Sequence, residues 1–285
     1  MTTLILKKTI ESHFEYEQSS VWASSNSVLA TVNQQLINLP LANLNDQHIT
    51  LGSWNTEYLW QAKANYFKSS YKQIIKRHHI LALQEVSSAG LSTIASVCDY
   101  NYFVSSPNSR GQAVGFLAHP RLKITNIHEY SELLDVYGIH DLRPAMQIDV
   151  FDPQTQITLS VITIHLKSML GGLSFTSLVR KKQLQNLIVA ISNKNHPTII
   201  LGDFNCFLDV STDIEPLFNN GFNIANPNNH TSTQLAGGRL DGLFYKNLPD
   251  LIAIKRYNIR NFWRASLAGR SLSDHGLLTW RLEKH

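Results

Sequence analysis

Short apolar runs alternate with longer amphipathic segments along the chain from His48 onward. The apolar runs consist mostly of aliphatic residues, as in ILAL at 80–83 and IIL at 199–201. Runs of this kind predict strands that are covered on both faces. The segments 62–77 and 178–192 between such runs predict helices. The alternation therefore predicts an α/β protein whose packed sheets carry helices on their outer sides.

The first 47 residues follow a different pattern. Apolar and polar residues alternate over 10–17, which predicts a strand, and apolar residues recur at helical spacing over 28–37, which predicts a helix. Pro40 would end this helix. We therefore expect 1–47 to form an amino-terminal appendage and 48–285 to form the main domain. The appendage offers a surface for a partner or for self-association.

The composition is that of an ordinary globular protein, with 43% hydrophobic and 16% charged residues among 285. No apolar run reaches the ~18–20 residues that a membrane-spanning helix needs, so we expect no integral membrane association. The start of the chain lacks the features of a signal peptide. A cytoplasmic location is the expectation, and export by a leaderless route stays open.

The net charge is +4 and the sequence pI is about 9.0. A mildly basic protein fits a polyanionic partner, although an unremarkable excess of Lys and Arg explains the charge equally well. The two cysteines, Cys98 and Cys206, do not make a disulfide scaffold. Two reduced thiols suit an intracellular protein, and whether they pair stays open.

Six predicted strands carry a polar residue of catalytic or ligating type at or near an end. Each residue alone has an ordinary explanation, such as a turn or a cap. Together they matter, because buried carboxylates repel one another and need a cation or hydrogen bonds. Oxygen ligands suit Mg²⁺ or Mn²⁺, and the zinc-type spacings of Cys and His are missing. The set comprises Asn55, Glu85, His165, Asp203 with Asn205, Asp241, and Asp274 with His275.

These strand ends occur in the motifs WNTEYL, LALQEV, ITIHLKS, ILGDFNC, RLDGLFY and SDHGLL, which span 53–278. The motifs and their order resemble the endonuclease/exonuclease/phosphatase superfamily, which includes pancreatic-type deoxyribonucleases. The resemblance implies a four-layer α/β sandwich, in which two packed mixed β-sheets are flanked by helices. It places the active site at one end of the strands.

The resemblance also implies the metal-binding residues. Glu85 is the expected primary ligand of Mg²⁺ or Mn²⁺, with Asn55 beside it. Asp274 completes or closes the metal site. Asp203 and Asn205 hold the attacking water, a second metal or the leaving oxygen, so they count as both catalytic and metal-binding.

The remaining catalytic roles follow from the same resemblance. His275 activates or orients the water, and Asp241 orients His275. His165 donates to the phosphate or the leaving group, and Arg143 matches a phosphate-binding arginine of some members. In deoxyribonuclease-like members a second carboxylate supports the first histidine. No equivalent is evident near 105–116, so it stays open whether His165 acts as an acid or only as a hydrogen-bond donor.

The substrate is less well defined than the reaction. Basic and aromatic residues interleave over 255–270, where Arg260 and Arg264 are candidate substrate-binding residues beside Phe262 and Trp263. This pattern favours a nucleic-acid partner, DNA more than RNA, although inward-packing aromatics would explain it too. The leading hypothesis is a Mg²⁺-dependent nuclease that acts on DNA.

The alternatives are an RNA-directed nuclease, a phosphoinositide phosphatase, a sphingomyelinase-type esterase and a catalytically inactive binding module. A membrane-docking loop would favour a lipid substrate, and SMLGGLSF at 168–175 is the candidate. The same loop could be a flexible substrate loop, because its two glycines allow unusual backbone angles. The full set of motif residues argues against an inactive relative.

Overall fold

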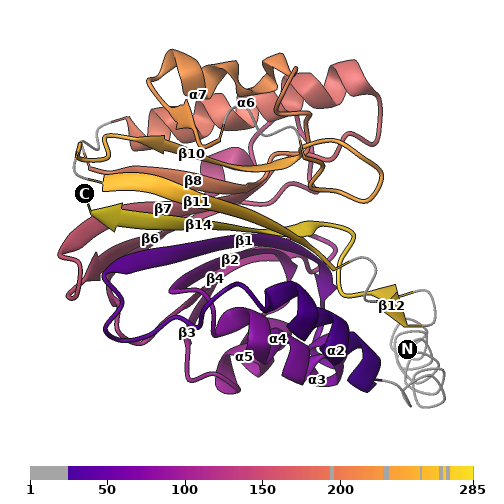
Figure 1. Cartoon of the computed structure of the whole chain (residues 1–285). Coiled ribbons are helices and arrows are strands. Elements are labelled where there is room, and N and C mark those ends of the chain that lie inside the picture. The colour runs from indigo at the N-terminus through magenta and orange to yellow at the C-terminus, as the bar shows by residue number, and fades with distance from the viewer. Residues whose placement is uncertain are drawn as a thin grey trace.

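The computed structural model describes residues 25–192, 196–226, 231–250, 252–262, 266–267 and 270–284. Figure 1 shows two sheets stacked face to face, with helices on both outer sides. One helical layer holds α2 (Ser25–Leu36), α3 (Gln61–Tyr66), α4 (Lys68–Ile75) and α5 (Ser88–Ser96), and the other holds α6 (Leu173–Ile191) and α7 (Glu215–Asn219). Short 3₁₀ helices η2 (Ser131–Leu133) and η3 (Thr212–Ile214) lie beside α6.

The two sheets have the same central pattern. The first runs in the order β11-β14-β1-β2-β4-β3 and the second in the order β5-β6-β7-β8-β10-β9. A parallel pair, β1–β2 or β7–β8, lies between antiparallel neighbours in each. The strands of the first sheet are β1 (His48–Leu59), β2 (Ile80–Val86), β3 (Asn101–Val104), β4 (Ala113–Ala118), β11 (Ile252–Asn261) and β14 (Gly276–Lys284). Those of the second are β5 (Lys123–Tyr130), β6 (Ala145–Asp152), β7 (Ile157–His165), β8 (Thr198–Asp203), β9 (Asn223–Ile224) and β10 (Asp241–Lys246). A separate hairpin is formed by β12 (Ser266–Leu267) and β13 (Arg270–Ser271).

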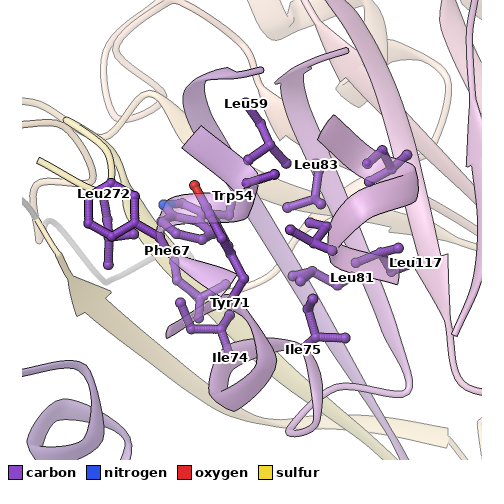
Figure 2. Packing of buried hydrophobic residues seen from close by; sticks show 14 of the residues in the cluster. Trp54, Leu59, Phe67, Tyr71, Ile74, Ile75, Leu81, Leu83, Leu117 and Leu272 are labelled. Atoms are coloured by element: carbon purple, nitrogen blue, oxygen red, sulfur yellow. The ribbon is translucent and has the colours of Figure 1, made fainter. Parts of the chain in front are cut away.

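The apolar strands are covered on both faces, as the sequence predicts. In β2, Ile80 and Ala82 point into the core between the sheets, whereas Leu81 and Leu83 pack under the first helical layer. Figure 2 shows this second environment, where Trp54 and Tyr71 pack among aliphatic side chains. A third core lies between the second sheet and α6. The predicted four-layer sandwich of two mixed sheets flanked by helices is confirmed.

Several element boundaries differ from those predicted. The helix expected over 62–77 is divided at Phe67, which leaves helical geometry (φ −90°, ψ 21°) and turns its ring into the core. The helix expected over 178–192 starts earlier, at Leu173. Within the described residues, no helix combines the length and apolar character that crossing a membrane would need.

The predicted appendage is described only in part. Its expected strand at 10–17 lies outside the described residues. Its helix is present as α2, and Val32 and Leu36 are buried in the same core as residues of α4. The domain boundary at residue 47 stays a prediction.

The two cysteines belong to different cores. Cys98 packs against the core under the first helical layer, and Cys206 is buried in the core under α6. Both sheets lie between these cores, so the thiols are not paired. Burial raises the pKa of Cys98 to about 11 and that of Cys206 to about 12, which keeps both as unreactive thiols at neutral pH.

The buried histidine His78 should make the protein sensitive to acid. Its Nδ1 contacts the Ile74 carbonyl oxygen and its Nε2 the Thr279 hydroxyl, both at 2.9 Å. Burial lowers the pKa of His78 to about 4, below the 6.5 of an unfolded chain. The unfolded chain therefore binds a proton at this histidine before the folded protein does. The free energy of unfolding is highest above pH 6.5 and falls as the pH drops towards 4. We expect this residue to contribute a slope of about 1.4 kcal/mol per pH unit to unfolding free energy in that window.

Urea unfolding between pH 7 and pH 5 tests this expectation. His78→Gln keeps a hydrogen-bonding side chain without the titration, so its stability should fall less steeply with pH. His128→Gln removes an exposed histidine and serves as the control. Equal slopes in the wild type and His78→Gln would contradict the assignment.

Candidate active site

Strand register brings three predicted site residues side by side in the second sheet. His165 pairs with Asp203 in the parallel β7–β8 ladder, and Asp241 pairs with Asp203 in the antiparallel β8–β10 ladder. Gly202 allows this close approach, because a Cβ atom there would lie 2.1 Å from the Ile164 carbonyl oxygen at a φ of +143°. Glycine is therefore required immediately before Asp203.

The turn after β8 fixes the Asp203 carboxylate. Asn205 takes up a left-handed conformation (φ 51°), which asparagine tolerates better than most residues. Its backbone N–H donates to Asp203 Oδ1 at 2.8 Å. Its side-chain Nδ2 donates to the Leu166 carbonyl oxygen at 3.1 Å and lies 3.3 Å from Asp203 Oδ2. Asn205 thereby ties the carboxylate to the segment that follows His165.

A β-bulge places Glu85 in the site from the first sheet. The register of β2 shifts between Gln84 and Val86 against both neighbouring strands, and Glu85 has a φ of +57°. Left-handed backbone is uncommon for glutamate and often marks a functional position. The bulge turns one residue of an otherwise buried strand towards the site.

Asn55 joins the two halves of the site. Its Nδ2 donates to Asp203 Oδ2 at 3.0 Å and to Glu85 Oε1 at 3.4 Å. Its Oδ1 accepts from the Glu57 N–H at 3.0 Å. Asn55 therefore offers its amide nitrogen to the carboxylates in this structure, and its oxygen is already hydrogen bonded.

The Ser-Asp-His segment is anchored to the end of β1. Ser273 Oγ donates to the Asn55 carbonyl oxygen at 2.5 Å and accepts from the His275 N–H at 2.9 Å. Trp54 Nε1 donates to the His275 carbonyl oxygen at 3.1 Å. Asp274 Oδ2 accepts from Gln234 at 3.2 Å, and its Oδ1 lies 4.0 Å from His275 Nε2.

Asp241 and His275 form a hydrogen-bonded pair with the geometry of a base and its orienter. His275 Nδ1 lies 2.8 Å from Asp241 Oδ2, which also accepts from Thr233 Oγ1 at 2.7 Å. His275 Nε2 faces Asp203 Oδ2 at 3.8 Å. Burial lowers the pKa of His275, but the carboxylates of Asp241 and Asp203 outweigh it and raise the pKa to about 10.

His165 has a different electrostatic environment. Burial and the nearby Arg143 hold its pKa well below the ordinary value, so the imidazole is neutral. Its Nε2 lies 3.5 Å from Asp203 Oδ2 and 3.9 Å from Glu85 Oε1. Because Nε2 faces two carboxylate oxygens, which accept hydrogen bonds, we assign the imidazole proton to Nε2. Nδ1 is buried and finds no partner in the part of the chain that the structure describes.

The donor set fits a divalent cation. Ligating atoms of Asp203, Asp241 and His275 lie within 4.8 Å of one another, and Glu85 and Asp274 flank this group. Burial and the adjacent Asp241 raise the pKa of Asp203 to about 7, against the lowering effect of His275. A cation bound among these carboxylates would favour their ionised forms and so lower the raised pKa of Asp203.

The sequence matches the Endonuclease/Exonuclease/phosphatase family over residues 52–275. The chain belongs to this family. Membership makes the protein a phosphoesterase, and the buried His/Asp cluster agrees with the divalent metal site typical of the family. A comparison with the curated proteins finds no match to the sequence.

Several solved structures share the fold at low sequence identity. D. rerio TDP2 complexed with a single-strand DNA product is 18% identical, with a TM-score of 0.66 over 84% of this chain and all (100%) of that one. The human nocturnin catalytic domain with bound sulfate is 17% identical, with a TM-score of 0.62 over 87% and 98%. A Bacteroides thetaiotaomicron mannosyl-6-phosphatase is 16% identical, with a TM-score of 0.61 over 82% and 99%.

Arg143, the predicted phosphate-binding residue, lies near the carboxylates of Glu85 and Asp203. The side chain is 8% exposed, and its Nη2 donates to Gln112 Oε1 at 3.0 Å. Its Nε is buried and finds no partner among the described residues. Burial lowers the pKa of Arg143, and the nearby carboxylates of Glu85 and Asp203 oppose that effect. The guanidinium retains a free donor beside the carboxylates.

In the described part of 255–270, Arg260 lies towards the site end of β11 and Lys255 towards the other end. Arg260 pairs with Leu277 at the end of β14 nearest His275. Lys255 lies at the opposite end of the strand, 3.6 Å from Glu283. Phe262 is fully buried and packs on Trp54 with ring centroids 5.4 Å apart, so it belongs to the core and not to a binding surface. Arg264 and Trp263 lie outside the described residues.

Sequence reasoning missed two supporting residues. Thr233 accepts from the Asp241 N–H and donates to the Asp241 carboxylate, and it lies in a loop with no motif of its own. Lys63 Nζ donates to the carbonyl oxygens of Thr56 and Glu57 at 2.8 and 2.7 Å. Burial lowers the pKa of Lys63 to about 8 despite Glu57 and the site carboxylates. A lysine at a helix start resembles a surface residue in sequence, so its buried position was not predictable.

A second group of candidate ligands, Asp46, His48 and His79, lies at the opposite end of β1. His79 Nδ1 accepts from the Thr50 N–H at 3.0 Å, and its Nε2 lies 3.2 Å from the Asn43 carbonyl oxygen. Arg281 Nη2 lies 3.0 Å from His48 Nε2. Both ring nitrogens of His79 and Nε2 of His48 already contact other groups, one of them an arginine, so we assign this group to a structural network.

Proposed function

We propose that the protein is a Mg²⁺- or Mn²⁺-dependent nuclease that hydrolyses DNA by attack of water on a phosphodiester. The observation that carries the reaction is the His275–Asp241 pair facing Asp203, with the free Nε of Arg143 beside the same carboxylates. The DNA substrate is supported by the single-strand DNA product of D. rerio TDP2 and by Arg260 near the site.

Glu85, Asp203 and Asp274 would hold the cation, with Asn55 and Asn205 positioning their carboxylates. When bound, such a cation supplies charge stabilisation to phosphoryl oxygens and activation of water. Neutralising the carboxylates would lower the pKa of His275 towards the range in which an imidazole accepts a proton. His275 would then take the proton of the attacking water, with Asp241 holding the ring in place.

The neutral His165 and the buried Arg143 would bind the phosphate. His165 would offer Nε2–H, and its lowered pKa makes the ring a neutral hydrogen-bond donor and not a charged acid. Arg143 offers its free guanidinium N–H to phosphate oxygens, as arginine commonly does.

A lipid phosphate is the second candidate substrate, because an apolar loop begins soon after His165. Leu170, Leu173 and Phe175 are 81%, 67% and 49% exposed. Exposed apolar side chains in a row can dock on a membrane surface. The purified protein should therefore be assayed with Mg²⁺ or Mn²⁺ on plasmid, linear DNA, RNA, inositol phosphates and sphingomyelin. Cleavage of sphingomyelin or inositol phosphates, with DNA left intact, would reject the nuclease proposal.

Salt-dependent binding gives a separate test of the DNA surface. If Arg260 contacts a phosphate, Arg260→Ala should flatten the slope of log affinity against log salt by about one unit. Lys255→Ala is the matched control, because this side chain lies at the far end of the same strand. The measurement uses the Asp203→Asn protein, which should bind without cleaving. Equal slopes for both variants would remove Arg260 from the binding surface.

A further inference from the structure

Two exposed aromatic side chains follow Asn55 at the end of β1. Tyr58 and Trp60 are each 39% exposed, although most large apolar residues of the strand are buried. Their rings stack with an interplanar angle of 24° and centroids 6.0 Å apart. Aromatic rings that stay exposed beside a catalytic site are surfaces for a ligand with its own flat face.

The stacked pair is held by its surroundings. Trp60 lies against Gly111, where an added Cβ would come within 3.1 Å of the indole ring. Tyr58 has a left-handed backbone (φ 62°), which is uncommon for an aromatic residue and marks a constrained position. The pair is therefore ordered before a ligand arrives, which reduces the entropy that binding must overcome.

The neighbouring residues Gly111 and Gln112 connect Trp60 with Arg143. Gln112 follows Gly111 and accepts from Arg143 Nη2 at 3.0 Å. Burial lowers the pKa of Arg143, and the carboxylates of Glu85 and Asp203 and the phenol of Tyr58 oppose that lowering from nearby. Tyr58 and the site carboxylates therefore lie around the same guanidinium.

We propose that Tyr58 and Trp60 form a stacking platform for one nucleobase of a single-stranded nucleic acid whose adjacent phosphate is bound by Arg143. The inference rests on the proposed nuclease function and deepens it, because it assigns the group that flanks the scissile phosphate. Bases of any sequence offer a π face, so the platform provides affinity without sequence readout. An inositol or a sugar phosphate lacks that face.

The test uses single-stranded deoxyoligonucleotides in which each position in turn carries 2-aminopurine or lacks its base. Binding is measured in the His275→Ala background to prevent cleavage. Trp60→Ala and Tyr58→Ala should each weaken binding of the intact oligonucleotide roughly five- to hundred-fold. They should have no such effect on the oligonucleotide that lacks the base at the platform position. Quenching of 2-aminopurine at that position should be weaker in Trp60→Ala than in the protein with both rings.

Tyr102→Ala is the matched control. Tyr102 is 43% exposed and lies in β3, towards the end of the sheet opposite Glu85. Equal losses for intact and base-lacking oligonucleotides at every position would overturn the platform, as would unchanged affinity in both alanine variants. Hydrolysis of the intact oligonucleotide by the wild-type protein reports the nuclease function separately. Failure to bind and to hydrolyse it would overturn both proposals, whereas hydrolysis with unaltered binding by the variants would overturn the platform alone.

Discussion

Chelation of divalent cations is expected to abolish phosphoester hydrolysis, and Glu85→Gln is expected to lower the rate more than about a hundred-fold at saturating Mg²⁺. Glu85 is held on a β-bulge, 3.9 Å from His165 and 3.4 Å from Asn55, among the site's polar side chains. Loss of a direct ligand should exceed the roughly ten- to hundred-fold effect typical of residues that only support a ligand. Rates with Mg²⁺, Mn²⁺ and EDTA check the expectation.

The fold should survive this substitution. Removing one charge from a group of carboxylates relieves repulsion, so the melting temperature of Glu85→Gln in EDTA should stay level or rise. Glu132→Gln changes an exposed glutamate and should alter neither property. Hydrolysis at full rate in excess EDTA would sink the metal assignment, and a large fall in melting temperature would show that Glu85 is a structural residue.

His275→Ala and Asp241→Asn should each lower the rate by roughly two to four orders of magnitude. The two side chains share a 2.8 Å hydrogen bond, so they should act as one unit. The double variant should then be little slower than His275→Ala alone. Single-turnover rates on one DNA substrate, with all variants at the same cation concentration, provide the comparison.

The double variant could instead lose as much rate as the two single variants multiplied together. If the two effects multiply fully, Asp241 does not serve His275 and acts instead on Asp203, its neighbour in the β8–β10 ladder. Asp135→Asn, which changes an exposed aspartate, controls for the loss of a carboxylate as such.

The site residues at the ends of strands were the easiest to predict from the sequence. His165, Asp203 and Asp241 follow apolar runs, and strand register then brings them together. The bulge at Glu85 was not predictable, because it depends on how β2 fits between two neighbours. Tertiary packing also decided that Phe262 faces Trp54 in the core.

Supporting residues were harder to find than the residues they support. Thr233 and Lys63 act through hydrogen bonds to groups far away in the chain or to backbone atoms, and neither contact leaves a periodic pattern. The division of the expected long helix at Phe67 also depends on tertiary packing, since the Phe67 ring lies in the core. Local sequence predicts elements well where burial is periodic and poorly where one side chain sets the geometry.

The site is shared between two sheets that touch mainly through apolar side chains. Glu85 belongs to the first sheet and Asp203 to the second, and Asn55 bridges them. A cation held by both carboxylates would act as a cross-link between the two halves of the sandwich. Binding would then raise the free energy of unfolding by RT ln(1 + [L]/Kd), where [L] is the cation concentration and Kd its dissociation constant. The fraction of protein that carries the cation and the free energy of unfolding would therefore increase together with cation concentration.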